Sequence, residues 1–241
     1  MSERSAAAIL SKHKFTVLWS GGKDSTAALL WVLDNVKHSN WNILYVEITG
    51  NTHKLCTEYV LETAGRLGVE DKLMIAKTKN FYELMDRWGP PLMFGYRWCL
   101  SQLKAEAFSK YTEHFVVDGI KRSDSRRRKK LKLITVMRVS DKITVSPLID
   151  WNSKQVYDYI RKHGVNINPC YTKYGHSGNC MFCPYADKRH ILLTINDPEW
   201  RNKILPILIK HKEKMMKGSI GRSVYSRWIE GAVQRTLPNQ H

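Results

Sequence analysis

Short apolar runs alternate with amphipathic stretches along the first 165 residues of the chain. Between the runs, apolar residues recur at helical spacing, as at Leu55, Tyr59 and Val60. Strands are predicted at 15–19, 41–48, 72–76, 114–118 and 142–145, and helices at 26–33, 53–67, 81–88, 98–111 and 153–162, the last capped by Ser153. Regular alternation of this kind predicts a parallel sheet with helices on both faces.

The pattern breaks near residue 165. Residues 166–184 are rich in Gly, Asn, Pro and Cys, and we expect a loop there that another group must hold in place. Helical patterns resume from Pro198 and again over 224–233. The predicted fold is therefore a Rossmann-like, doubly wound, mostly parallel α/β domain over residues 1–165. A cysteine-rich loop and basic helices over 166–241 are expected to pack on it.

A glycine-rich turn follows the first predicted strand and reads Ser20-Gly21-Gly22-Lys23-Asp24-Ser25, with Thr26 opening the next helix. Backbone N–H groups of such a turn, together with a helix N-terminus, form a cradle for a phosphate. The spacing is neither G-x-x-x-x-G-K-[ST] nor G-x-G-x-x-G. The alternative is an ordinary tight turn capped by Asp24 and Ser25. We expect a pyrophosphate cradle whose candidate residues are Ser20, Gly21, Gly22, Asp24, Ser25 and Thr26.

Two further loops follow other predicted strands. Thr49, Gly50 and Asn51 come after the second strand, and the loop 119–123, which includes Gly119, Ile120 and Ser123, comes after the fourth. Ligands of open α/β sheets bind beyond the carboxyl ends of the strands. These residues are therefore expected to face the same crevice as the glycine-rich turn and to bind the same nucleotide.

The chain has five cysteines. Cys180 and Cys183 form a C-x-x-C in the loop, and Cys170 and Cys99 lie further off. A set of four thiolates suits a [4Fe–4S] cluster or tetrahedral zinc, and a single close pair with two scattered cysteines favours the cluster. A thioredoxin-type redox pair is a third interpretation. The candidate metal ligands are Cys99, Cys170, Cys180 and Cys183.

Other side chains near the cysteines have simpler interpretations. Cys56 falls on a predicted helix and is expected to be a small buried hydrophobe. His176 and His190 are alternative ligands, but hydrogen-bonded histidines are the simpler expectation. Four thiolates would fill all four iron sites, so a structural or redox role is expected for the cluster rather than carriage of sulfide.

The net positive charge of the chain indicates which kinds of partner it could bind. The formal net charge is +17, from 39 Lys+Arg against 22 Asp+Glu, and one run reads Arg126-Arg127-Arg128-Lys129-Lys130. Such an excess attracts polyanions, so tRNA or DNA is a candidate partner, with a merely solvated basic surface as the alternative. No apolar run approaches the ~20 residues of a membrane span, so we expect no membrane partner and a cytoplasmic location.

Together these motifs resemble the phosphoadenosine phosphosulfate reductase family of the PP-loop superfamily, whose fold is adenine nucleotide alpha-hydrolase-like. The similar segments are Ser20–Ser25, Glu47–Asn51, Arg97–Cys99 with Lys104, Asp118–Ser125 with Arg128, and Ser146–Trp151. The segment Asp118–Ser125, together with Arg128, is similar to the family pattern G-x-R-x-x-E-S-x-x-R. The resemblance implies adenine-nucleotide chemistry but does not fix one reaction.

Two departures from the reductases bear on that reaction. No cysteine follows Cys183, whereas the reductases use a nucleophilic cysteine near the C-terminus, and Cys99 lacks an adjacent cysteine. The remaining pattern is similar to the iron–sulfur ATP pyrophosphatases of DNA phosphorothioation. We therefore expect an ATP pyrophosphatase or adenylyltransferase that activates a group for sulfur transfer. A sulfonucleotide reductase using an external thiol and a nucleotide-binding module without turnover are the alternatives.

The resemblance implies roles for individual residues. ATP would lie along the carboxyl edge of the sheet, with Lys23 and Arg122 or Arg128 supplying charge to the leaving pyrophosphate. Asp24 would hold Mg²⁺ through water or cap the helix. Thr49, Gly50 and Ile120 would border the adenosine. A sulfur-donor protein and a second copy of the chain are further candidate partners.

Overall fold

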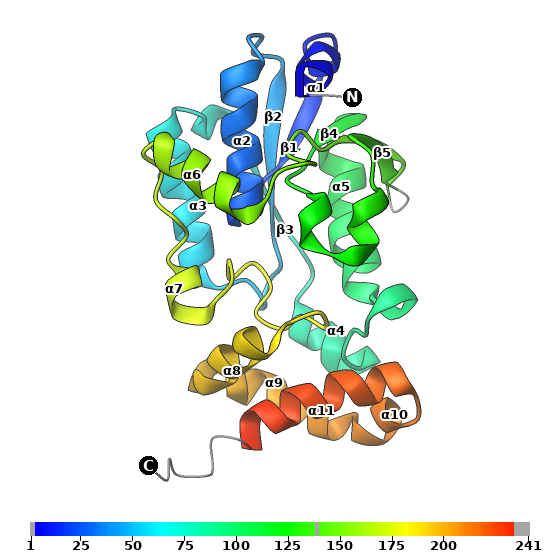
Figure 1. The fold of residues 1–241 in the computed structure, drawn as a ribbon. Coiled ribbons are helices and arrows are strands. Elements are labelled where there is room, and N and C mark those ends of the chain that lie inside the picture. Colours follow the sequence, from blue (N-terminus) through cyan, green and yellow to red (C-terminus); the bar gives the residue numbers. More distant parts are fainter. Residues whose placement is uncertain (1–2, 138–139, 234–241) are drawn as a thin grey trace.

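The computed structural model describes residues 3–137 and 140–233, and the described chain builds a six-stranded sheet with helices on both faces (Figure 1). The strand order is β3-β2-β1-β4-β6-β5, and every pair is parallel except β5 with β6. This confirms the predicted doubly wound α/β class. The strands are β1 (Phe15–Leu18), β2 (Trp41–Glu47), β3 (Leu73–Lys77), β4 (Phe115–Val117), β5 (Ile134–Met137) and β6 (Lys142–Val145).

The helices follow the predicted alternation through α6. They are α1 (Glu3–Leu10), α2 (Lys23–Asn35), α3 (Lys54–Leu67), α4 (Phe81–Trp88), α5 (Ala105–Tyr111), α6 (Ser153–Lys162), α7 (Cys170–Tyr174), α8 (Lys188–Asn196), α9 (Pro198–Lys210), α10 (Lys212–Met216) and α11 (Ser219–Val233). The bounds predicted for α4 and α6 are confirmed. Asn152, not Ser153, caps α6, because the Asn152 side chain accepts the Gln155 N–H at 3.0 Å.

Several elements differ from the predicted pattern. The stretch 98–111 is helical throughout, as predicted, but it includes a π-helical turn at Leu100–Lys104 that leads into α5. Helix α7 lies within the stretch expected to be a loop, and α1, β5 and α8 are not predicted at all. Strand β5 is half-exposed and lies at the sheet edge, although its sequence Ile-Thr-Val-Met is as apolar as that of β1.

Helix α2 is the central packing element of the sheet. Its residues from Ser25 to Val32 are all buried, which explains their nearly continuous apolar sequence. Figure 1 shows α2 and α6 over one face of the sheet, and α5 on the other. The N-terminus of α2 therefore lies immediately after β1, at the carboxyl edge of the sheet.

The C-terminal helices α8 to α11 lie beyond this carboxyl edge, next to α4 (Figure 1). Arg227 of α11 fastens the preceding loop, since its guanidinium donates to the carbonyls of Pro184 at 2.6 Å and Ala186 at 2.8 Å. Among the described helices, none has both the length and the apolar character needed to cross a bilayer.

Candidate active site

The turn between β1 and α2 adopts the shape of a phosphate cradle. Gly21 has a φ of +70°, and a Cβ there would lie 2.9 Å from the Cys56 sulfur, so the position requires glycine. The Gly21 carbonyl accepts a hydrogen bond from the Asn168 side chain at 2.8 Å. The turn is thus fixed from outside by α3 and by the loop that carries Cys170, and the buried Cys56 confirms its predicted role as a small hydrophobe.

The hydroxyl groups of the turn organise its backbone. Ser25 Oγ accepts the Ser20 N–H at 3.1 Å, donates to the Gly22 carbonyl at 2.9 Å, and lies 3.1 Å from the Ser20 hydroxyl. Thr26 is buried and accepts the indole N–H of Trp19 at 3.0 Å. The N-cap residue of α2 is Gly22, and no side chain caps the helix. Ser25 thus braces the turn as the capped-turn alternative predicts, whereas Asp24 pairs with lysines and does not cap the helix.

One N–H group of the cradle has a partner from a distant part of the chain. The backbone N–H of Lys23 donates to the hydroxyl of Tyr171 at 3.1 Å. Tyr171 lies on α7, directly after Cys170, and its burial raises the pKa of the phenol above its usual range. A neutral hydroxyl thus lies where a phosphate oxygen of a bound nucleotide would accept the same hydrogen bond.

The loop after β4 packs directly against the start of α2. A Cβ on Gly119 would lie 2.8 Å from the Ser25 amide nitrogen and closer still to the Asp24 carbonyl, so only glycine fits there. Asp118, buried at the end of β4, accepts the Ser146 hydroxyl at 2.6 Å and the Ile120 N–H at 3.1 Å. Burial raises the pKa of Asp118 despite these hydrogen bonds. The predicted approach of Gly119 and Ile120 to the glycine-rich turn is therefore present.

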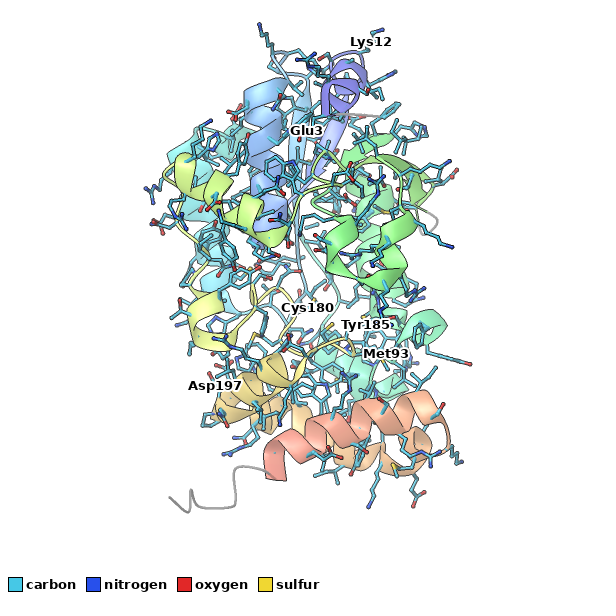
Figure 2. All side chains as sticks on the ribbon, in the orientation of Figure 1. Glu3, Lys12, Met93, Cys180, Tyr185 and Asp197 are labelled. Atoms are coloured by element: carbon cyan, nitrogen blue, oxygen red, sulfur yellow. The ribbon has the colours of Figure 1, made fainter. Side chains whose placement is uncertain are left out.

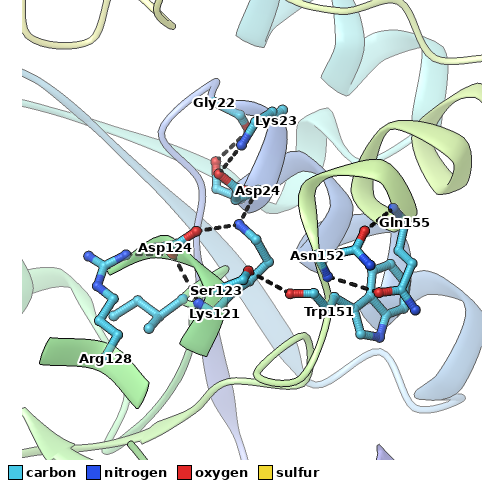
Figure 3. A network of polar contacts seen from close by, with 12 residues as sticks. Gly22, Lys23, Asp24, Lys121, Ser123, Asp124, Arg128, Trp151, Asn152 and Gln155 are labelled. Carbon is cyan, nitrogen blue, oxygen red and sulfur yellow. Dashed lines mark hydrogen bonds and ion pairs between the residues drawn. The ribbon is translucent and has the colours of Figure 1, made fainter. Parts of the chain in front are cut away.

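Lys121 is the centre of the charged network at this junction (Figure 3). Its side chain is fully buried, and its ammonium pairs with Asp24 and, at 2.7 Å, with Asp124. Asp24 also accepts Lys23 Nζ at 2.6 Å, and Asp124 accepts Arg128 at 2.6 Å. Burial alone would raise the pKa of Asp124, but hydrogen bonds from Lys121 outweigh it and lower the pKa. Three cations and two carboxylates thus alternate beside the cradle.

Lys121 falls within the loop 119–123 that the sequence placed at the crevice, but the charge-supplying role was predicted for Arg122 and not for Lys121. The structure places the Arg122 guanidinium on Asp150, with Nε donating to the Leu131 carbonyl at 2.8 Å. Ser123 donates its hydroxyl to the Trp151 carbonyl at 2.8 Å. Neither side chain reaches the turn. The sequence did contain an indication of this role: in the family pattern G-x-R-x-x-E-S-x-x-R, which begins here at Gly119, Lys121 occupies the position of the first arginine.

The loop after β2 contacts the cysteines rather than the turn. The Asn51 side chain accepts the Phe182 N–H at 2.8 Å and donates to the Phe182 carbonyl at 3.0 Å, which fixes the middle of the C-x-x-C. Thr49 donates its N–H to Thr78, and Gly50 lies against Asn80 at the start of α4. Thr49 and Gly50 therefore lie against the start of α4, and Asn51, which the sequence placed at the nucleotide crevice, instead positions the cysteine loop.

Three of the four candidate ligands border one cavity of about 180 Å³. Its lining includes Cys99, Cys180 and Cys183, together with Arg97 and Lys104. Figure 2 shows Cys180 near the level of α4, between the sheet and the C-terminal helices. Burial and then the neighbouring Cys180 raise the pKa of Cys99 to about 12, so without a metal this thiol stays protonated at neutral pH.

Cys170 is not part of this group. Its sulfur packs against Gly178, where a Cβ would lie 2.6 Å away, and its N–H donates to Asn168 at 2.9 Å. The four cysteines are therefore not brought together. Among the residues that the structure describes, no three histidine, cysteine or carboxylate side chains converge on a single metal ion.

His176 and His190 stack on each other with ring centroids 3.5 Å apart. Burial lowers the pKa of His176 to about 2, and the neighbouring His190 adds to the effect. His190 Nε2 lies 2.9 Å from the Met181 carbonyl. Both rings are therefore neutral packing groups beside the cysteine loop.

Fold and site together define an α/β protein of the PP-loop superfamily, with a phosphate-type cradle between β1 and α2 and cysteines beyond it. The sequence model of the phosphoadenosine phosphosulfate reductase domain matches residues 14–186, so the chain belongs to that family. The family is named for an enzyme, phosphoadenosine phosphosulfate reductase.

Three known proteins illustrate the relationship. An uncharacterised protein of Methanocaldococcus jannaschii is 30% identical over 224 residues, which cover 88% of this chain and 51% of that protein; the chain thus spans about half the length of this relative. The crystal structure of phosphoadenylyl-sulfate reductase from Candida auris, a phosphate complex, covers 71% of this chain and 84% of its own at 18% identity, with a TM-score of 0.52, which shows the shared fold. The U34-tRNA thiolase NcsA from Methanococcus maripaludis, solved with its [4Fe–4S] cluster, has a TM-score of 0.47 at 12% identity and covers 99% of this chain and 80% of its own.

Proposed function

We propose that this protein binds ATP at the Ser20–Ser25 turn and releases pyrophosphate from it, so activating an acceptor for sulfur transfer. The observation that carries the proposal is the uncapped N-terminus of α2 with the ammonium groups of Lys23 and Lys121 beside it. A helix N-terminus with fixed cations beside it favours a phosphate chain, and such a chain would replace the Tyr171 hydroxyl as the partner of the Lys23 N–H. Gly119 adds to this support, because it allows the loop after β4 to reach the cradle.

The chemistry that suits this arrangement is nucleotidyl transfer. An acceptor oxygen attacks the α-phosphorus, the bond from that phosphorus to the bridging oxygen breaks, and pyrophosphate leaves with the electron pair. Lys23, Lys121 and Arg128 supply positive charge where negative charge grows on the leaving group. Asp24 already accepts two lysines, so its role in this proposal is to hold these cations rather than to bind Mg²⁺.

Adenosine recognition remains part of the proposal. Gly119 and Ile120 adjoin the cradle and are suited to border the nucleoside, because a backbone edge there is fixed by Asp118. Thr49 and Gly50 are left out of the nucleotide site, since they contact Thr78 and Asn80 at the start of α4. Arg122 is likewise left out of the charge-supplying set, because its guanidinium is held by Asp150.

For the cysteines we propose a [4Fe–4S] cluster held by Cys99, Cys180 and Cys183. The donor set fits, because three thiols border one cavity and the cations Arg97 and Lys104 would balance thiolate charge. A cluster with three protein thiolates keeps one iron open to an external ligand such as sulfide. A three-cysteine cluster would therefore suit carriage of sulfide, whereas the structural or redox role was expected for four cysteine ligands. Zinc is less suited, because it needs ligands that converge on one ion.

Pyrophosphate release from ATP, measured with and without single-stranded nucleic acid, tests the proposal. Wild-type protein should release pyrophosphate, and the Asp24→Ala and Ser25→Ala variants should lose ATP binding, whereas Arg122→Met should not. Sulfite formation from an adenylyl sulfate would instead identify a sulfonucleotide reductase. Tight ATP binding without any product would identify a module without turnover.

A further inference from the structure

Exposed aromatic rings lie next to the lining of the cysteine cavity, since Tyr185 follows the lining residue Pro184 and contacts the lining residue Arg97. Phe94 is 53% exposed, Tyr96 is 67% exposed and Tyr185 is 42% exposed. The rings of Phe94 and Tyr185 meet edge to face at 6.3 Å, and the Phe94 N–H donates to the Tyr185 hydroxyl at 2.7 Å. Figure 2 shows Tyr185 and the neighbouring Met93 beside Cys180. Large apolar rings held together in solvent commonly mark a binding surface.

An arginine guanidinium lies over the ring of Tyr185, and another lies over the ring of Phe94. Arg97 lies over Tyr185 at 5.5 Å, and Arg127 lies over Phe94 at 5.4 Å. Arg97 also lines the cysteine cavity, and Arg127 belongs to the basic run 126–130. Neither arginine has a carboxylate partner within residues 3–137 and 140–233. We call Phe94, Tyr185, Arg97 and Arg127 the aromatic–arginine platform.

Backbone strain accompanies the exposed position of the platform. Phe94 has a φ of +59°, a region that residues with a Cβ rarely adopt, so folding accepts strain to present this ring. From the other side, Arg227 fixes the carbonyls on both sides of Tyr185. Flat rings fixed in solvent beside unpaired cations match a ligand that is both planar and anionic.

We infer that the aromatic–arginine platform binds unpaired nucleotides of a single-stranded nucleic acid and presents them to the cysteine cavity. Bases stack on aromatic and guanidinium faces, while the run 126–130 attracts the phosphates. A duplex keeps its bases stacked inside and offers only its backbone charge. The inference rests on the proposed function in one respect, since it identifies the acceptor that the ATP site would activate.

Fluorescence anisotropy with labelled oligonucleotides, in the absence of ATP, tests the platform directly. Wild-type protein should bind a single strand more tightly than the duplex of the same sequence at equal salt, with RNA and DNA strands compared as two arms. Phe94→Ala should weaken single-strand binding about tenfold, which is roughly 1.4 kcal/mol, and leave duplex binding unchanged. Tyr185→Ala provides a second platform variant if Phe94→Ala is poorly folded.

The matched control is Tyr111→Ala. Tyr111 is 38% exposed and lies under the Lys110 ammonium at 5.0 Å, but it ends α5 ahead of β4, at the amino edge of the sheet. This variant should bind the single strand as wild type does. Equal affinity for single strand and duplex, or unchanged binding by both platform variants, would overturn the inference. ATP binding measured on the same variants reports separately on the proposed function, because the platform does not touch the turn.

Discussion

Replacing Lys121 with methionine tests the charged network that fixes the start of α2. The change keeps a long apolar stem but removes an ammonium that is fully buried between Asp24 and Asp124. Two carboxylates would then face each other with the cation between them gone. Arg128 would still pair with Asp124, and Lys23 with Asp24.

The size of the effect follows from burial. Removing one partner of a buried ion pair costs about 3–5 kcal/mol, because the remaining charge stays desolvated. The side chains of Asp24 and Asp124 are 29% and 23% exposed, so water and the remaining cations relieve part of that cost. We expect Lys121→Met to lower the free energy of unfolding by about 3 kcal/mol at pH 7, at the low end of that range.

Urea unfolding at several pH values measures this loss. The folded-state pKa of Asp124 is lowered in the wild type, so pairing stabilises the fold above the unfolded-state pKa of about 3.9 and is lost as the pH falls through the folded-state pKa. Without Lys121 that lowering is largely removed. The difference between wild type and Lys121→Met should therefore shrink as the pH is lowered below about 4.

Arg122→Met is the matched control for this experiment. Arg122 is the next residue, but its guanidinium pairs with Asp150, whose side chain is 64% exposed. Exposed ion pairs contribute at most about 1 kcal/mol. The reasoning is refuted if both variants lose the same stability, or if the loss for Lys121→Met does not change with pH.

Three further predictions concern the cradle and the cysteines. Gly119→Ala should destabilise the fold by at least about 3 kcal/mol in chemical denaturation, because its Cβ would overlap the α2 backbone; Gly65→Ala, at an open helical position, should instead gain about 0.5–1 kcal/mol, and equal effects would contradict the packing argument. Tyr171→Phe should strengthen ATP binding about fivefold in calorimetry, because phosphate no longer displaces a hydroxyl worth about 1 kcal/mol; weaker binding would show that the hydroxyl assists the nucleotide. Cys99→Ser should lose the iron and sulfide of anaerobically purified protein while Cys170→Ser keeps them, and the reverse pattern would refute the three-cysteine assignment.

The sequence by itself determined the order and type of most elements of the α/β core. Helix α4 has the predicted bounds because its signals are local: the Asn80 side chain accepts the Tyr82 N–H at 3.0 Å, and Gly89-Pro90-Pro91 ends the helix. The glycine-rich turn is local in the same way. Its residues follow one another in the chain, so their spacing alone predicts a cradle.

The tertiary structure decided which side chains meet. Lys121 and Arg122 are adjacent and equally basic, yet one is buried against Asp24 and the other reaches the distant Asp150, because neighbouring residues of an extended turn point in different directions. Cys170 is separated from Cys180 by the packing of α7 against the cradle. Tyr171 reaches Lys23 across 148 positions of sequence, a contact that only the folded chain can specify.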